Sequence, residues 1–180
     1  MESRLAVVDP VAAVIGGQIS TVPAPVWAPW PVPPSWVFSG LAFTGLPGRD
    51  GSAVTCWSGP DPFGDPAELL LISEEAGAGV GSHFAALAVT YPGPEVGEGT
   101  PHAKFEVEDR PVPLWAVSDV PPDRAVYAGE AAGRWLWVVV HPAEAGALVV
   151  EPVHLVDARG LGAELTVLPV GELSPRFVVD

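Results

Sequence analysis

Proline and glycine set the strongest limit on the fold of this chain, because 22 prolines and 20 glycines stand among its 180 residues. This share is about double the usual one. Proline lacks the backbone N–H that a helix interior needs, and both residue types favour turns. The composition therefore argues against a helical bundle or a coiled coil. It favours short strands joined by many turns. Together with the strand and helix patterns described below, it predicts an α+β fold, in which a mostly antiparallel β-sheet carries one or two short helices packed on a face.

The length and charge of the chain narrow its class further. A chain of 180 residues suits one domain and buries roughly 70% of the surface that the unfolded chain exposes. Eight Lys and Arg residues oppose 22 Asp and Glu residues, which gives a formal net charge of −14. Nucleic-acid binding needs clustered basic side chains, whereas here seven arginines and Lys104 are scattered singly. We therefore expect no nucleic acid among the partners.

The N-terminal residues carry no recognisable targeting or membrane signal. The apolar stretch over residues 5–15 is interrupted by Asp9 and Pro10, although a signal peptide needs a continuous apolar region. No run approaches the 18 or more apolar residues that span a bilayer. We expect a cytoplasmic protein with no membrane contact. Its residues 1–22 are predicted to form a loosely ordered arm, followed by a single α+β domain over residues 23–180.

The domain opens with an extended segment rich in proline and tryptophan. Residues 23–36 hold six prolines and three tryptophans, so this segment is extended and not helical. In one interpretation Trp27 and Trp30 form an interaction surface, with the segment docking as a polyproline ligand on a partner. In the other, the tryptophans cover the core of the domain itself. We favour the second, because exposing three tryptophans would cost several kcal/mol at roughly 25 cal/mol per Å².

Strand patterns follow the proline-rich segment as far as residue 141. Residues 104–108 alternate cleanly between polar and apolar, which indicates a strand with one buried face. Residues 134–141 are apolar on both faces, which predicts a central strand covered on two sides. The other predicted strands are residues 36–43, 53–57, 68–73, 112–117 and 125–128.

Helix signals are scarce. Residues 82–87 are predicted to form one short helix. Residues 152–160 are predicted to form another, because proline stands near the start, Arg159 in the last turn and Gly160 at the end. A final strand is predicted over residues 163–168.

A glycine-rich segment is the main candidate for ligand binding. Gly77, Gly79, Gly81, Ser82 and His83 lie between a predicted strand and a predicted short helix, where backbone N–H groups can hold an anion. The dinucleotide fingerprint is incomplete, since Ser82 stands at its third glycine position. A plain glycine turn is therefore the favoured interpretation, and nucleotide or anion binding is the alternative.

The remaining reactive residue types form no recognisable catalytic or metal site. The single cysteine, Cys56, excludes an intramolecular disulfide and a zinc site of several cysteines, and a buried structural role fits its place in a strand. The four histidines lack metal-ligand spacing, and His102 alternates with Glu106 and Glu108 as on a solvated strand face. Three acidic residues near Arg124 are typical of turn capping and a surface ion pair; they are Asp119, Asp123 and Glu130. We expect no catalytic residue, metal or cofactor.

Seven short motifs are spread over residues 25–177: Pro25-Val-Trp-Ala-Pro-Trp-Pro-Val-Pro33, Trp36-Val-Phe-Ser-Gly40, Gly77-Ala-Gly-Val-Gly81, Pro113-Leu-Trp115, Asp123-Arg-Ala-Val-Tyr-Ala-Gly-Glu130, Arg134-Trp-Leu-Trp137 and Leu173-Ser-Pro-Arg176. Together these motifs resemble an uncharacterised family of actinobacterial proteins. The resemblance implies an actinobacterial cytoplasmic protein and supplies no activity. Longer members of that family carry a zinc-ribbon-like, Cys-rich segment ahead of the domain, and no Cys-x-x-Cys occurs before Cys56 here.

The sequence favours a non-catalytic binding or protein-interaction module. Another protein is the expected partner, and homo-oligomerisation through an exposed sheet edge is compatible with the strand-rich pattern. The alternative is a small enzyme or a nucleotide- or anion-binding domain that uses the glycine-rich segment.

Overall fold

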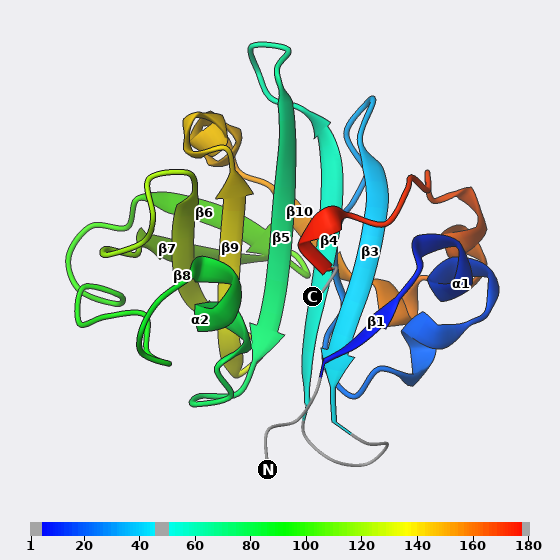
Figure 1. The fold of residues 1–180 in the computed structure, drawn as a ribbon, viewed down its shortest axis with the longest axis horizontal. Coiled ribbons are helices and arrows are strands. Elements are labelled where there is room, and N and C mark those ends of the chain that lie inside the picture. Colours follow the sequence, from blue (N-terminus) through cyan, green and yellow to red (C-terminus); the bar gives the residue numbers. More distant parts are fainter. Residues whose placement is uncertain (1–4, 46–50, 178–180) are drawn as a thin grey trace.

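The computed structural model describes residues 5–45 and 51–177, which form one bent β-sheet with short helices on its outside (Figure 1). Within these residues ten strands follow the order β1-β3-β4-β5-β9-β8-β7-β6-β10-β2. Neighbouring strands are antiparallel, except that β10 runs parallel to β6. This architecture confirms the predicted α+β class. The strands are β1 Ala6–Val8, β2 Trp27–Pro29, β3 Val37–Thr44, β4 Ser52–Pro60, β5 Pro66–Glu74, β6 Ala103–Val107, β7 Arg110–Ala116, β8 Ala125–Ala131, β9 Arg134–His141 and β10 His154–Asp157.

Hairpins that the sequence indicates make up the centre of the sheet. β9 lies between β5 and β8, and its last six residues are buried, as the apolar character of both its faces predicts. β6 and β7 form a second hairpin, in which Phe105 and Val107 of β6 are buried and Lys104 is exposed. The predicted period-two pattern is therefore confirmed.

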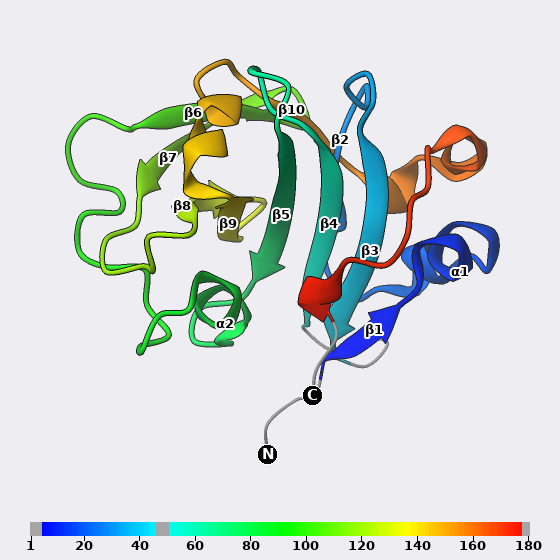
Figure 2. The same ribbon diagram turned by 45° about the horizontal axis from the view of Figure 1, so that its top comes forward.

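One face of the central strands is covered by the sheet itself. The sheet bends until β2, its last strand, lies against β4 and β5 (Figures 1 and 2). The larger hydrophobic core fills the space between these layers, and it includes Trp27, Trp57 and Phe105. The hydroxyl of Thr55 in β4 donates a hydrogen bond to the carbonyl oxygen of Trp27 in β2 at 2.7 Å, which links the two layers.

The opposite face of the central strands is covered by two short segments. These are α2 (Val80–Ala85) and the C-terminal residues that include η5 (Pro175–Phe177), which lie on the same side of the sheet in Figure 1. The rings of Phe84 and Phe177 meet edge to face, with their centroids 5.7 Å apart. A second, smaller core forms under them.

The N-terminal residues differ from the loosely ordered arm that we expected over residues 1–22. Their described part begins with β1, which pairs with β3, and continues into α1 (Pro10–Ile15) and the 3-10 helix η1 (Gln18–Thr21). These elements are held because their apolar side chains enter the larger core. The side chains concerned are Val8, Ala13, Ile19 and Val22.

Two predictions near the C-terminus are wrong. The helix expected over residues 152–160 is replaced by β10 and the short 3-10 helix η3 (Ala158–Gly160), because β10 fills the gap between β6 and β2. The strand expected over residues 163–168 is a 3-10 helix, η4 (Gly162–Val167), which lies beside α1. Another 3-10 helix, η2 (Ala143–Val149), follows β9. At residues 154–157, pairing with distant strands therefore overrode the local helix signals.

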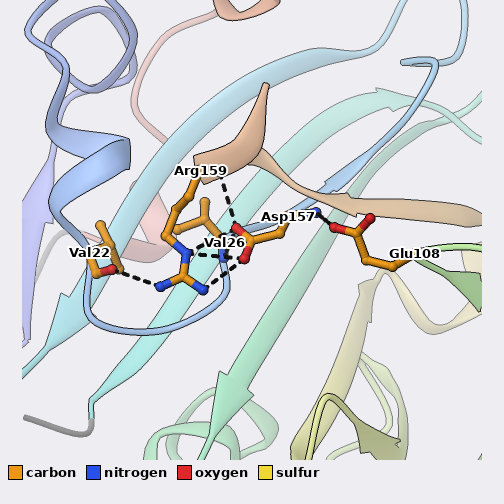
Figure 3. A network of polar contacts seen from close by, with 5 residues as sticks. All are labelled: Val22, Val26, Glu108, Asp157 and Arg159. Atoms are coloured by element: carbon orange, nitrogen blue, oxygen red, sulfur yellow. Dashed lines mark hydrogen bonds and ion pairs between the residues drawn. The ribbon is translucent and has the colours of Figure 1, made fainter. Parts of the chain in front are cut away.

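A polar network anchors β10 to the N-terminal segment (Figure 3). The carboxylate of Asp157 accepts hydrogen bonds from the side chain of Arg159 and from the backbone N–H of Val26 at 3.2 Å. Arg159 donates onward to the carbonyl oxygen of Val22 at 3.2 Å, and Glu108 accepts from the N–H of Asp157 at 2.7 Å. The network is internal to the fold, and we assign it a structural role.

Candidate functional site

In the glycine-rich segment, the backbone N–H groups at the start of α2 already donate hydrogen bonds to a carboxylate of the protein itself, that of Glu74. Glu74, the last residue of β5, is fully buried, and its Oε2 accepts from the N–H of Val80 at 2.8 Å and of Gly81 at 3.2 Å. Burial raises the pKa of Glu74, and the two backbone hydrogen bonds oppose that rise. The indole of Trp137 also lowers this pKa, although its N–H falls short of a formed hydrogen bond. The amides that would hold a nucleotide phosphate are therefore already used.

The glycines of this segment have structural reasons to be glycine. Gly77 and Gly79 have φ values of +85° and +82°, which side chains other than glycine rarely adopt. Gly81 packs directly beneath the indole of Trp137. Ser82 donates its hydroxyl to the carbonyl oxygen of Gly79 at 3.0 Å, and His83 is exposed. The favoured interpretation as a glycine turn fits this geometry.

The two tryptophans proposed as an interaction surface are not equivalent. Trp27 is 2% exposed and belongs to the larger core, so it does not form a contact surface. Trp30 is partly buried against that core, and its backbone N–H donates to the carbonyl oxygen of His154 at 2.9 Å. The interpretation of this segment as a cover of the core fits both positions.

A polar row crosses three central strands where β4 ends, β5 begins and β9 ends. Ser58 pairs with Glu68, and Glu68 pairs with His141, so the three side chains share one face of the sheet. The next row on that face, Cys56, Leu70 and Val139, belongs to the smaller core. The polar row therefore lies at the edge of an apolar surface.

The C-terminal segment binds this row through Glu68. The Oε2 atom of Glu68 accepts hydrogen bonds from the hydroxyl of Ser174 at 2.8 Å, from Nε of Arg176 at 3.0 Å and from the thiol of Cys56 at 3.4 Å. These contacts place the guanidinium of Arg176 beside the polar row. Cys56 is fully buried, and burial raises the pKa of its thiol, so it is no activated nucleophile.

An open pocket of about 670 Å³ lies over the polar row. Asp123 adds a further carboxylate to its wall and forms an ion pair with Arg124, at 2.8 Å between Oδ1 and Nε. Hydrogen bonds from Arg124 hold the pKa of Asp123 below its usual range. Arg124 also donates to the carbonyl oxygen of Phe84 at 2.8 Å, which fixes it at the end of α2. The pocket is lined by Ser58, Gly59, Pro60, Gly64, Pro66, Ala67, Glu68, Asp123, His141, Pro142 and Arg176.

His141 is the most unusual residue of the pocket. It is 4% exposed, and its imidazole has no hydrogen-bond partner among the side chains and backbone groups of the described residues. Burial lowers its pKa to about 4, with further lowering by the positive charges of Arg176 and Arg124. The ring is therefore neutral at pH 7, with one N–H donor and one nitrogen acceptor.

The pKa of His141 predicts a pH dependence of stability. Between pH 4 and 6.5 the unfolded chain binds a proton at His141 that the folded chain does not, so the free energy of unfolding rises with pH in this window. The full shift corresponds to about 3 kcal/mol, and because the ring faces an open pocket we expect about 1–2 kcal/mol. His141→Gln removes this rise, measured as the difference between urea unfolding at pH 4.5 and pH 7.

The raised pKa of Glu74 acts in the opposite direction, since stability from that group falls as pH rises. The contribution of Glu74 is the same in H141Q and in the unchanged protein. The difference between the two proteins therefore measures the contribution of His141 alone. An identical pH dependence in the two proteins would contradict the prediction.

Sequence reasoning missed this pocket, since His141, Glu68 and Arg176 lie far apart along the chain. No local motif marks them, and only the strand register and the path of the C-terminal segment bring them together. Among the described residues, no three or more His, Cys, Asp or Glu side chains are grouped to hold a metal ion. No helix in the described part of the chain has the length and apolar character needed to cross a membrane.

Comparison with known proteins places the chain in a family. Neither a curated protein nor a solved structure matches it significantly. A match to a family of unknown function, DUF6758, extends over residues 4–177 and so includes every element described above. The chain therefore belongs to the family of unknown function DUF6758.

Proposed function

We propose that this domain is a non-catalytic binding module and that the pocket over the polar row is its ligand site. The observation that carries the proposal is His141, which is buried, neutral and without a hydrogen-bond partner among the described residues, yet lines an open pocket. The ring nitrogens of His141 are not among the buried polar atoms that lack a partner, so they are open to the pocket, and a ligand can form the hydrogen bonds that the protein leaves unmade. The volume of about 670 Å³ suits a small molecule.

The surrounding groups favour binding over catalysis. Nucleophilic catalysis needs a hydroxyl or thiol in contact with a base. The hydroxyl of Ser58 is bonded to the hydroxyl of Ser39 at 2.6 Å, and that of Ser174 donates to Glu68. Cys56 is buried below the row. None of these three groups is bonded to His141.

The test is thermal unfolding with a panel of nucleotides, phosphorylated metabolites, acyl-CoA species, small carboxylic acids and divalent metals. A ligand at about 100 times its Kd adds roughly 2.7 kcal/mol, which raises the midpoint by about 5–10 °C. Pro66→Trp, at an exposed position of the pocket wall, is expected to abolish the shift. Pro62→Trp, exposed in the turn that precedes β5 but outside the pocket wall, is the matched control and keeps the shift. A shift retained in P66W contradicts this site, and a flat panel contradicts a small-molecule ligand.

A protein partner is the second candidate, and Phe63 favours it. This side chain is 77% exposed in the β4–β5 turn, next to the pocket wall. The carboxylate of Asp61 holds the turn by accepting from the N–H groups of Phe63 at 2.8 Å and Asp65 at 3.0 Å. An exposed aromatic side chain on a turn whose backbone is held in this way suits a contact with another protein. Light scattering at two concentrations distinguishes a second copy of this chain from a different partner.

We also propose a cytoplasmic location and an actinobacterial source, with a zinc-ribbon-like segment in longer relatives. The family resemblance supports these three points. The acidic charge and the single cysteine are compatible with the cytoplasm.

A further inference from the structure

The guanidinium of Arg176 is oriented by one contact and keeps most of its donors unused. Its Nε donates to Glu68, and its backbone N–H donates to the hydroxyl of Ser174 at 3.3 Å. Its two terminal nitrogens carry four N–H donors and have no hydrogen-bond partner among the described residues. Because the side chain lines the pocket and is 36% exposed, these donors are available to a ligand.

The two carboxylates at the pocket already have partners. Glu68 accepts three hydrogen bonds on one oxygen, including that from Arg176. Both oxygens of Asp123 accept from Arg124, at 2.8 and 3.1 Å. The two arginines and two carboxylates give the site no net formal charge. The hydrogen-bonding capacity that remains unused includes the four N–H donors on the terminal nitrogens of Arg176. Such donors favour an acceptor with negative charge.

The charged groups around His141 also favour an anionic ligand. The groups that influence the imidazole are Arg176, Arg124, Asp123 and Glu68, in decreasing order of effect. The two arginines lower the pKa more than the two carboxylates raise it, so the charged groups around the ring favour its neutral form. The imidazole without a hydrogen-bond partner and the guanidinium of Arg176 on the same pocket wall both suit an anionic oxygen atom.

Resting on the proposed function, we infer that the ligand carries an anionic oxygen group, a carboxylate or a phosphate, held between the terminal nitrogens of Arg176 and the imidazole of His141. The guanidinium supplies a planar pair of donors that matches either group. The ring N–H of His141 supplies one more. The uncharged remainder of the ligand lies against Pro60, Pro66 and Pro142 on the pocket wall.

The experiment compares probes of matched shape by titration calorimetry. Benzoate and phenyl phosphate bind, whereas benzamide, the neutral counterpart of benzoate, binds at least tenfold more weakly. The anion with the higher affinity shows whether a carboxylate or a phosphate is the preferred group. In R176Q the affinity for both anions falls at least tenfold, R176K recovers part of it, and R110Q, at an exposed arginine of β7, leaves it unchanged.

A pH series adds a readout that a structural role of His141 does not produce. A bound anion raises the pKa of His141 from about 4, so benzoate binds more tightly at pH 5.5 than at pH 7. H141Q loses this difference. Each variant is first unfolded without ligand, so that a lost fold is not mistaken for lost binding.

The outcomes separate the inference from the proposed function. If neither anion binds, or if benzamide binds as tightly as benzoate, the inference is wrong. A neutral ligand that binds and is lost in P66W leaves the proposed function standing. If R176Q and H141Q both fold and bind the anions unchanged, the assignment of these two residues is overturned.

Discussion

Trp27→Ala is expected to lower the free energy of unfolding by about 3–5 kcal/mol, which is a large part of the stability of a domain this size. The indole is 2% exposed between β2 and the central strands, so its removal leaves a cavity in the larger core. The backbone of β2 cannot move in to close that cavity, because it is held in place by Thr55 and by pairing with β10, so neighbouring side chains fill it only in part. Urea unfolding followed by circular dichroism measures the effect.

Trp30→Ala is the control, since Trp30 lies in the same segment and is only partly buried. We expect a smaller loss, of about 1–2 kcal/mol. The ratio between the two variants tests whether this proline-rich segment covers the core. A W27A protein of unchanged stability would contradict the buried position of Trp27.

Gly81→Ala is expected to destabilise the protein by about 3 kcal/mol, although helix propensity alone predicts a gain of about 1 kcal/mol at such a position. An added Cβ atom would lie 2.4 Å from three ring atoms of Trp137. That indole is fully buried and cannot move aside. The sign of the measured change therefore decides between local propensity and packing.

Gly77→Ala provides the matched comparison for Gly81→Ala. Its φ of +85° is unfavourable for alanine, but no atom lies within 4 Å of the added Cβ. We expect a loss of about 1 kcal/mol from backbone strain alone. Equal losses at the two glycines in urea unfolding would contradict the packing argument.

The central strands were predictable because their signals are local. The alternation in β6 and the apolar faces of β9 each occupy fewer than ten residues and carry their own evidence of burial. One local signal was present and not used: Asp9 followed by Pro10 is a typical helix start. In the structure the carboxylate of Asp9 accepts from the N–H of Val11 at 3.0 Å and thereby begins α1.

The pocket and the C-terminal elements were not predictable in this way. Residues 154–157 become a strand only because β6 and β2 leave a gap between them. His141 and Glu68 are neighbours only because of the register between β5 and β9. Arg176 joins them through the C-terminal segment, which meets β3 in a single β-bridge between Val170 and Phe38. Each of these positions depends on contacts between distant parts of the chain.

The network around Asp157 has a consequence for the order of folding. It joins residues separated by 131 positions in the case of Val26 and by 49 in the case of Glu108. During synthesis on a ribosome, Trp27 emerges long before β10, the strand that pairs with β2. Contacts of such wide separation slow the search for the native state. Most of the chain must therefore be made before the larger core can close, so the nascent chain exposes its tryptophans to chaperones during that interval.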